Sequence, residues 1–316
     1  MIQYIIKRLA ISVLIVFLIS VFAFSLMHIL PGDPVKLVLG EEASQADVDA
    51  LREKLNLNKP LVEQYFLWIK GVFCGDFGES ITYSRNVSVL LAERLPRTIS
   101  IGVPALIISI IFGVLFGVIS AIKRGRWLDR VITIISTIGA GTPVFWLGIL
   151  GIFIFSVELK LLPIQGYVSP SEDLVGYIQH AILPIACMSL GLLTAIARQT
   201  RSNMLEVVNQ DYVRTARANG IGEGKIILSH ALKNALIPII TIIALQVRMV
   251  IGGSVLVEEV FNIPGVGALL KVAVANRDYL VVQGCVLVIS LVTVGCNFIV
   301  DVLYGVVNPA IRTERN

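Results

Sequence analysis

Six long apolar runs constrain this sequence more than any other feature. They cover residues 9–30, 98–122, 131–157, 181–197, 234–257 and 281–307. A helix needs about 20 apolar residues to cross a bilayer, and we expect flanking residues to extend the short fourth run. The runs do not alternate in polarity, as the strands of a membrane barrel would. Because only helices and closed barrels satisfy the backbone in lipid, the sequence predicts an all-α polytopic membrane protein with six transmembrane helices.

The composition agrees with this class, because 15% of the residues are charged and 56% are hydrophobic. A soluble chain carries roughly 25% charged residues. The first run begins with Lys7 and Arg8, as a signal peptide does. Its apolar part is too long for a signal peptide, however, and no small-residue cleavage site follows it. We therefore expect an uncleaved first span.

Lysine and arginine are concentrated in alternate loops. The loop 123–130 carries four and the loop 198–233 carries six, whereas the opposite loops carry one, Lys160, and two, Lys271 and Arg277. Loops rich in basic residues stay in the cytoplasm. The pattern predicts that both termini and the two basic loops are cytoplasmic, as an even number of spans requires. The net charge of +4 mostly reflects this asymmetry and not a nucleic-acid surface.

The segment 31–97 is the one sizeable piece outside the spans, so we expect a folded extracytoplasmic insertion after the first helix. Ser44 and Asp47 form a capping-box pattern, which predicts that a helix follows. A second helix is expected at Leu61–Val72, and Gly75-Asp-Phe-Gly78 is typical of a turn. The four cysteines show neither metal-ligand spacing nor a disulfide framework, so no metal site is expected.

Glycines and prolines mark places where the spans pack or bend. Gly113 and Gly117, four residues apart in the second run, favour the close approach of another helix. Pro104, Pro143 and Pro184 lie within or near spans, where proline can kink a helix.

A short basic segment, Asp211–Gly220, lies between the fourth and fifth spans. Asn209 or Asp211 suits the start of a helix there, and Asn219-Gly220 suits its left-handed end. Such a helix of about eight residues, about 12 Å long, is too short to be stable alone in water. Its two sides differ, with Tyr212, Val213 and Ala216 on one and Arg214 and Arg217 on another. We expect it to dock on a partner; a basic helix resting on lipid headgroups is the alternative.

We expect no catalytic residue and no nucleotide site in this chain. Gly220–Ile226 superficially resembles a phosphate loop, but Asn219 stands where its first glycine belongs and Ile226 replaces the metal-binding hydroxyl. An intramembrane serine protease would use Ser254 with a base within hydrogen-bond reach. The histidines His28, His180 and His230 are expected near span ends or in a loop, although His180 could share the depth of Ser254.

An ion-driven carrier is another functional class to consider. Such carriers depend on ionisable groups inside the membrane. Arg248 and Asp301 are the candidates. Arg248 is expected about 21 Å from the inner end of its span and Asp301 about 30 Å from the outer end of its own, so they should not pair. Asp301 is then an interfacial charge. Arg248 either lines a pathway, where it could meet a substrate carboxylate, or pairs with an acidic group of a partner subunit.

Several motifs together resemble one family. The segment 212–220, Tyr-Val-Arg-Thr-Ala-Arg-Ala-Asn-Gly, and the segment 230–238, His-Ala-Leu-Lys-Asn-Ala-Leu-Ile-Pro, resemble the ATPase-docking loop of ABC importer permeases. They match the form of that loop in the peptide/nickel branch, with Arg214-Thr-Ala216 at its Glu-Ala-Ala triplet. The family's outer insertion is similar to Pro31–Pro34, Leu51–Leu57, Pro60–Tyr65, Gly75–Gly78 and Arg94–Thr98, and its outer gate to Gly252–Glu258 and Phe261–Gly267.

The resemblance implies a permease subunit of a dipeptide/oligopeptide-type ABC importer, which is not an enzyme, in a bacterial-type inner membrane. It implies three parts: the first helix with its insertion in 1–97, a five-helix core with the coupling loop in 98–308, and a cytoplasmic tail in 309–316. Di- and oligopeptides are the expected solutes, with glutathione and nickel chelates as alternatives.

The resemblance also implies partners and site residues. The partners are a second permease, two ATP-binding subunits that hold ATP and magnesium, and an external solute-binding protein; this chain itself binds no cofactor. The ATPase-coupling residues would be Asp211, Tyr212, Arg214, Thr215, Ala216, Arg217 and Gly220. The pathway and outer gate would use Arg248, Glu258, Phe261, Pro264 and Gly265. Glu258 and Glu259 could instead contact the binding protein or solvate a helix end, and the insertion could be a passive cap.

Overall fold

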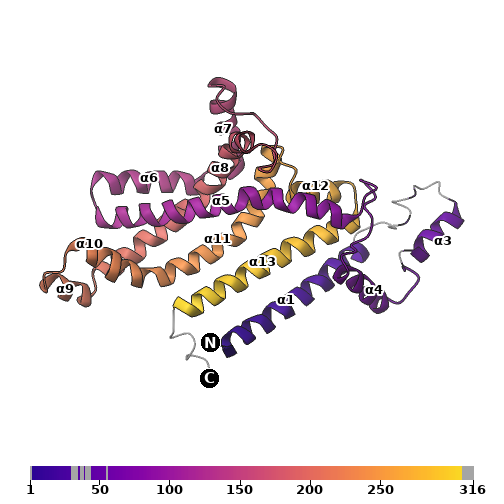
Figure 1. The fold of residues 1–316 in the computed structure, drawn as a ribbon, viewed down its shortest axis with the longest axis horizontal. Coiled ribbons are helices and arrows are strands. Elements are labelled where there is room, and N and C mark those ends of the chain that lie inside the picture. The colour runs from indigo at the N-terminus through magenta and orange to yellow at the C-terminus, as the bar shows by residue number, and fades with distance from the viewer. Residues whose placement is uncertain (1, 30–34, 36–38, 40–43, 55, 308–316) are drawn as a thin grey trace. The chain divides into compact units, whose positions relative to one another are not determined.

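The computed structural model describes residues 2–29, 35, 39, 44–54 and 56–307. Most of these residues are helical, and the β pairing among them is one isolated bridge between Glu79 and Asn86. The α-helices are α1 (Ile2–Ile29), α3 (Gln45–Lys54), α4 (Leu61–Phe73), α5 (Val87–Ile122), α6 (Trp127–Gly141), α7 (Val144–Gly151), α8 (Leu174–Val208), α9 (Asp211–Ala218), α10 (Glu223–Lys225), α11 (Leu232–Val260), α12 (Val266–Ala275) and α13 (Tyr279–Val307) (Figure 1). Two π-helical segments, η1 (Ile152–Glu158) and η2 (Ile226–Ala231), continue α7 and precede α11.

Four of these helices are long and apolar enough to cross a membrane, namely α1, α5, α8 and the Tyr279–Val302 part of α13. Two bent pairs are further candidates: Trp127–Gly141 with Val144–Glu158, bent by 105°, and Glu223–Leu236 with Pro238–Val247, bent by 56°. The part of the chain that the structure describes thus holds four to six candidate spans. This confirms the all-helical membrane class, while the six-span topology stays a prediction.

The bend between α6 and α7 has a local cause. Thr142 is extended, with φ −97° and ψ 126°. Pro143 follows it, and the ring of a proline disfavours the helical conformation in the residue before it. The run 131–157 is therefore divided into two helices, whereas α8 continues through Pro184 from Leu174 to Val208. Because α8 extends so far, the loop expected at 198–233 begins inside a helix.

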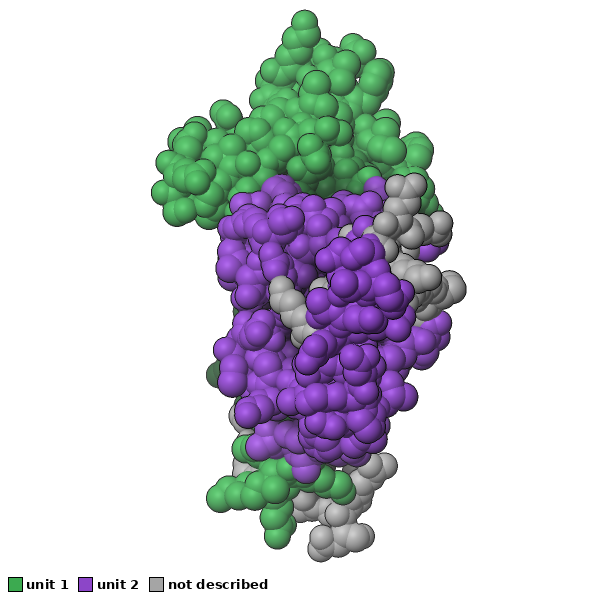
Figure 2. Space-filling view, turned by 90° about the vertical axis from the view of Figure 1, so that its right-hand side faces the viewer, with its two compact units in different colours: residues 1–8, 99–263, 296–316 green, residues 9–98, 264–295 purple. Residues whose placement is uncertain are grey.

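Contacts group the chain into two compact units, which Figure 2 colours separately. Unit 1 comprises residues 1–8, 99–263 and 296–316, and unit 2 comprises 9–98 and 264–295. The predicted division at residues 97 and 308 is into consecutive segments of the chain and not by contacts. It stays a prediction. Two of the segments named above, Pro31–Pro34 and the tail 309–316, lie outside the described residues.

Unit 1 has its main core between α5, α8 and α11. Ile101 of α5, Cys187 of α8 and Val257 of α11 belong to one buried cluster. The α5–α8 contact is close at the two glycines, where a β-carbon on Gly113 would lie 2.8 Å from Ile196 and one on Gly117 would lie 2.4 Å from the Thr200 β-carbon. Neither glycine leaves room for a side chain, so the expected close-packing face is confirmed and its partner is α8.

Unit 2 contains the described part of the predicted insertion, in which the two expected helices form. Ser44 accepts a 3.2 Å hydrogen bond from the Asp47 N–H and donates a 2.6 Å bond to its carboxylate, which completes the predicted cap of α3. The α4 helix is one residue longer than predicted, and its Tyr65 and Trp68 rings lie 5.6 and 5.8 Å from the ring of Phe24 on α1. These aromatic contacts hold α4 against the end of the first helix.

A buried aspartate joins two distant segments of unit 2. Asp278 is 0% exposed and lies just before α13. Its carboxylate accepts a 2.6 Å bond from the Ser80 hydroxyl and a 3.0 Å bond from the Thr82 backbone N–H. It also accepts a 3.4 Å bond from the N–H of Val281 in the first turn of α13. Such bonds compensate the cost of burying a carboxylate.

Candidate functional site

The predicted coupling segment forms the eight-residue helix α9. Its extent agrees with the expectation, but its start does not, because Gln210 occupies the N-cap and no side chain caps the helix. Asp211 is the first helical residue, with a side chain 98% exposed. Asn209 instead ends α8, donating a 2.7 Å bond from Nδ2 to the carbonyl of Leu205. The prediction that Asn209 or Asp211 caps this helix is therefore wrong, since α8 extends far enough to use Asn209 itself.

The helix α9 ends in a Schellman motif at Gly220. This glycine has a φ of +74°, in the left-handed region. Its N–H donates a 3.0 Å bond to the carbonyl of Arg217, and the N–H of Ile221 donates a 3.2 Å bond to the carbonyl of Ala216. These bonds satisfy carbonyls that a helix end leaves unpaired. A β-carbon on Gly220 would meet nothing within 4 Å, so the position requires glycine for its backbone and not for space.

One face of α9 is buried against its own chain. Val213 and Ala216 are 0% and 8% exposed, and they form a small apolar cluster with the fully buried Ile226 and with Ile221. Burial of this face stabilises a helix that is too short to persist alone. Ala216, a predicted coupling residue, thus packs against its own chain, where it positions α9.

Polar contacts attach α9 to the beginning of α11. Asn234 donates a 2.7 Å bond from Nδ2 to the hydroxyl oxygen of Tyr212. That hydroxyl in turn donates a 3.4 Å bond to the carbonyl of His230. The two motif segments 212–220 and 230–238 therefore meet in space, with Tyr212 as the link.

The charged residues of α9 are more exposed than its buried face. The Arg214 side chain is 71% exposed and only 3.6 Å from Asp211, a weak surface pair. Arg217 donates a 2.7 Å bond from Nε to Glu223, which raises the pKa of Arg217 above its ordinary value. Thr215 turns its hydroxyl back to the carbonyl of Asp211 at 3.0 Å. Asp211 and Arg214 are thus the most available charges of the predicted set.

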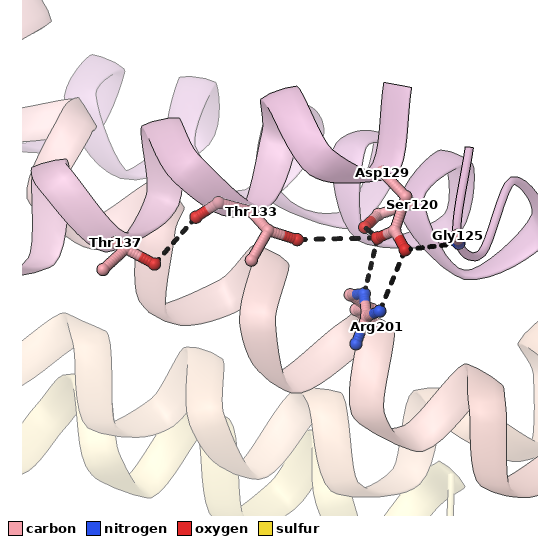
Figure 3. Close-up of polar contacts among 6 residues, drawn as sticks. All are labelled: Ser120, Gly125, Asp129, Thr133, Thr137 and Arg201. Carbon is pink, nitrogen blue, oxygen red and sulfur yellow. Dashed lines mark hydrogen bonds and ion pairs between the residues drawn. The ribbon is translucent and has the colours of Figure 1, made fainter. Parts of the chain in front are cut away.

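A polar cluster that the sequence analysis did not identify lies where α5, α6 and α8 meet (Figure 3). Asp129, in the first turn of α6, is 5% exposed. Its carboxylate accepts bonds of 2.8 and 3.0 Å from Nε and Nη2 of Arg201 and of 2.9 Å from the Gly125 N–H. The hydroxyl of Ser120 donates to the same carboxylate. Because it has several donors and an opposite charge, this carboxylate is stable in a buried place.

The signal for this cluster in the sequence is faint. Asp129 is the one acidic residue in the basic loop 123–130, beside an apolar run. Arg201 lies 72 residues away, and the sequence analysis counted it among the loop cations. The structure corrects that placement, because Arg201 belongs to α8, the helix that leads into α9.

The predicted gate residues begin at the end of α11. Glu258 and Phe261 are 2% and 3% exposed, and a second Schellman motif follows them. Asn262 has a φ of +51°, and the N–H of Ile263 donates a 2.8 Å bond to the carbonyl of Glu258. The carbonyl of Phe261 accepts a 2.9 Å bond from the N–H of Gly166, in the loop before α8.

The last two predicted gate residues, Pro264 and Gly265, belong to unit 2 and precede α12. The carbonyl of Pro264 lies 3.5 Å from Nη1 of Arg97, and the N–H of Val266 donates a 2.9 Å bond to the Thr98 hydroxyl. The motif that ends at Thr98 therefore contacts the one that starts at Phe261.

The two intramembrane charges considered for a carrier have separate outcomes. The side chain of Arg248 lies outside the described residues. Asp301 forms an ion pair of 2.9 Å with Arg8, and its backbone carbonyl accepts a 3.0 Å bond from the hydroxyl of Tyr4. The expected interfacial charge thus has a partner on α1 that the sequence analysis did not foresee.

Comparison with known proteins covers nearly the whole chain. The family model described as the inner membrane component of binding-protein-dependent transport systems matches residues 113–313, and the N-terminal model of such membrane components matches residues 1–102.

Similar proteins match from end to end. The chain is 40% identical over 309 residues to a probable peptide ABC transporter permease protein of Sinorhizobium fredii, covering 98% of this chain and 99% of that protein. It is 39% identical over 310 residues to a putative peptide transport system permease protein of Brucella abortus, with 98% and 99% covered. It is 41% identical over 312 residues to the glutathione transport system permease protein GsiC of Escherichia coli K12, with 99% of each covered. The chain therefore belongs to the family of binding-protein-dependent transport system inner membrane components.

Proposed function

We propose that this chain is a permease subunit of an ABC importer, and that it forms part of the pathway by which di- and oligopeptides cross the membrane. ATP is hydrolysed by partner subunits, and this chain is not an enzyme. Two relatives named as peptide permeases, similar over almost their full lengths, support the solute class. The family description, which couples an inner membrane component to a binding protein, supports the import machine.

In this proposal the chain has six spans with both termini in the cytoplasm. It pairs with a second, homologous permease, two ATP-binding subunits dock on the inner side, and an external solute-binding protein delivers the solute. The four continuous candidate spans and the two bent pairs support this topology. The basic loops 123–130 and 198–233 support its orientation.

The observation that carries the proposal is the way in which α9 is held. Its buried face packs on Ile226, its end is set by the left-handed Gly220, and Tyr212 ties it to Asn234. Its most exposed charges are those of Asp211 and Arg214. A short helix that is rigid toward the spans and charged toward the outside can transmit a displacement without bending.

The mechanism that follows is a shift between two packings of the spans. ATP binding closes the motor, and differential contacts with α9 stabilise one packing over the other. Asp211, Arg214, Thr215 and Arg217 meet the motor directly in this mechanism. Tyr212, Ala216 and Gly220 position the helix, while Arg248, Glu258, Phe261, Pro264 and Gly265 stay proposed for the pathway and gate.

A site-directed cross-link tests this assignment. Arg214→Cys, in a background where the exposed Cys74 is replaced by Ser, places a thiol on the exposed side of α9. The assembled transporter should cross-link at this position to an ATP-binding subunit. The matched control is Arg124→Cys, an exposed arginine on the α5–α6 turn, which should not. A residue 214 thiol that reacts only with lipid-borne reagents would contradict the proposal.

Glutathione is a second candidate solute, because the relative GsiC is named as a glutathione permease and is similar over the same length. Uptake of a labelled dipeptide in competition with glutathione separates the two. If excess glutathione abolishes uptake of the dipeptide and labelled glutathione accumulates directly, glutathione and not di- and oligopeptides is the solute. Nickel chelates, a third candidate, are tested by the same competition.

A further inference from the structure

The turn between α5 and α6 presents positive charge that none of the described residues neutralises. Arg124, Arg126 and Arg130 are exposed, and Lys123 is half-buried. None of the four forms an ion pair with another residue that the structure describes. Four cations within eight residues would repel one another, so the turn favours an anionic partner.

The acidic residue of this turn is not available to balance the arginines. Asp129 is 5% exposed, and its carboxylate is occupied by Arg201, Ser120 and the N–H of Gly125 (Figure 3). Its charge is therefore paired with Arg201 of α8 and does not balance the arginines of the turn. The outward side of the turn keeps its full cationic character.

An exposed apolar stripe begins at the same turn. Trp127, Val131, Ile134 and Ile138 follow one another at spacings of four, three and four residues along α6, which places them on one face of the helix. They are 69%, 41%, 58% and 62% exposed, respectively. A tryptophan at the end of an apolar stripe is typical of the boundary between lipid headgroups and acyl chains.

Charge and stripe together have the chemistry of one kind of ligand. The guanidinium groups of the three arginines suit phosphate oxygens, which they can bind with two parallel hydrogen bonds. The stripe below Trp127 suits a hydrocarbon chain. Contact with water alone does not favour a tryptophan that is 69% exposed. A soluble anion would leave the apolar stripe without a partner.

The geometry points to a binding site for an anionic phospholipid at the α5–α6 turn, with the phosphate at Arg124, Arg126 and Arg130 and an acyl chain along the exposed face of α6. Trp127 lies at the junction of the two parts. The site requires only that α5 and α6 lie in a membrane. It is independent of the solute and of the partner subunits proposed above.

Lipid retention tests the site. The full chain is purified, together with the subunits that stay bound to it, from membranes that contain phosphatidylglycerol and phosphatidylcholine in equal amounts. The retained lipids and subunits are counted by mass spectrometry. The native chain should retain phosphatidylglycerol preferentially. The variant Arg124→Gln/Arg126→Gln/Arg130→Gln should reduce that preference at least about tenfold, because each basic residue near an anionic surface contributes about a fivefold factor.

Two further variants make the result specific. The control Lys59→Gln/Lys70→Gln/Lys160→Gln removes the same charge elsewhere in the chain and should leave the preference unchanged. The variant Arg124→Lys/Arg126→Lys/Arg130→Lys keeps the charge but not the paired hydrogen bonds, so it should retain more of the preference than the glutamine variant and less than the native chain. It also guards against misfolding of the neutral variant. Trp127→Ala should weaken retention of phosphatidylglycerol while leaving the binding of free glycerol phosphate unaffected.

Three outcomes would overturn the inference. The first is an equal effect of the turn variant and the control variant. The second is full displacement of retained lipid by millimolar inorganic phosphate, which would make the site one for a soluble anion. The third is unchanged lipid retention with loss of the ATP-binding subunits from the turn variant, which would make the surface a protein contact.

Discussion

Arg201 and Asp129 form a two-point ion pair between α8 and α6, with Nε and Nη2 of the guanidinium 2.8 and 3.0 Å from the carboxylate oxygens. The side chain of Asp129 is 7% exposed and that of Arg201 is 32% exposed. Because α8 leads directly into α9, this pair links the helix before α9 to the α5–α6 turn. A displacement of α8 should therefore carry α6 with it.

Removing one partner of this pair should cost more than removing both. Arg201→Leu leaves the Asp129 charge buried without its main partner. We expect the free energy of unfolding to fall by about 2 to 3 kcal/mol. This loss is smaller than that for a fully buried pair because Arg201 is partly exposed. Asp129→Leu/Arg201→Leu should recover part of that loss. Thermal unfolding of the four members of this double-mutant cycle in one detergent measures the coupling, and strictly additive effects would contradict it.

The α5–α8 contact should not tolerate a side chain at Gly117. A β-carbon there would lie 2.4 Å from the Thr200 β-carbon and 2.7 Å from the Ala197 carbonyl, so Gly117→Ala should destabilise unit 1 by about 1 to 3 kcal/mol. Gly141→Ala is the matched control, because a β-carbon there meets nothing within 4 Å. The yield of monodisperse protein and its thermal midpoint report the difference. Equal behaviour of both variants would show that the helices are not so close.

The Asp278 carboxylate should be necessary for the structure of segment 75–86 in unit 2. Asp278→Ala leaves the Ser80 hydroxyl and the Thr82 N–H without their acceptor, at a cost of about 2 to 4 kcal/mol. The control is Asp76→Ala, since Asp76 is exposed and accepts one 2.9 Å bond from the Gly78 N–H. Limited proteolysis of segment 75–86 measures the effect. Cleavage should accelerate strongly in the first variant and little in the second, and the reverse order would refute the role of Asp278.

Most features that the sequence predicted correctly depend on neighbouring residues. The extent of α9 and its stop at Gly220 follow from a short basic segment and an Asn-Gly pair, whose hydrogen bonds are all local. The cap of α3 at Ser44 and the turn at Gly75 are of the same kind. Such patterns act within one helical turn, so a single sequence suffices to find them.

The features that the sequence did not predict depend on residues far apart along the chain. The partner of Asp129 is 72 residues away, and that of Asp301 is 293 residues away. Ala216 was expected to meet a partner subunit, but only the folded position of Ile226 shows that this face is covered. The early start of α5 at Val87 was missed because polar residues such as Glu93 interrupt its apolar pattern.

The Gly220 position gives the account its most direct prediction. With a φ of +74°, Gly220→Val strains the end of α9 by about 1 to 2 kcal/mol and should loosen its fixed direction, although the space around it is open. Gly222→Val is the matched control, because Gly222 has a φ of −61° and equally open surroundings. Gly220→Asn should lie between the two, since asparagine tolerates this conformation.

The decisive measurement is the number of ATP molecules hydrolysed for each solute molecule imported by the reconstituted transporter. We predict that this ratio rises at least about fivefold in Gly220→Val, with normal assembly of the complex, and stays at the native value in Gly222→Val, because strain of this size shifts an equilibrium by about that factor. A native ratio in Gly220→Val, in a fully assembled complex, would contradict the claim that the motor acts on the spans through α9.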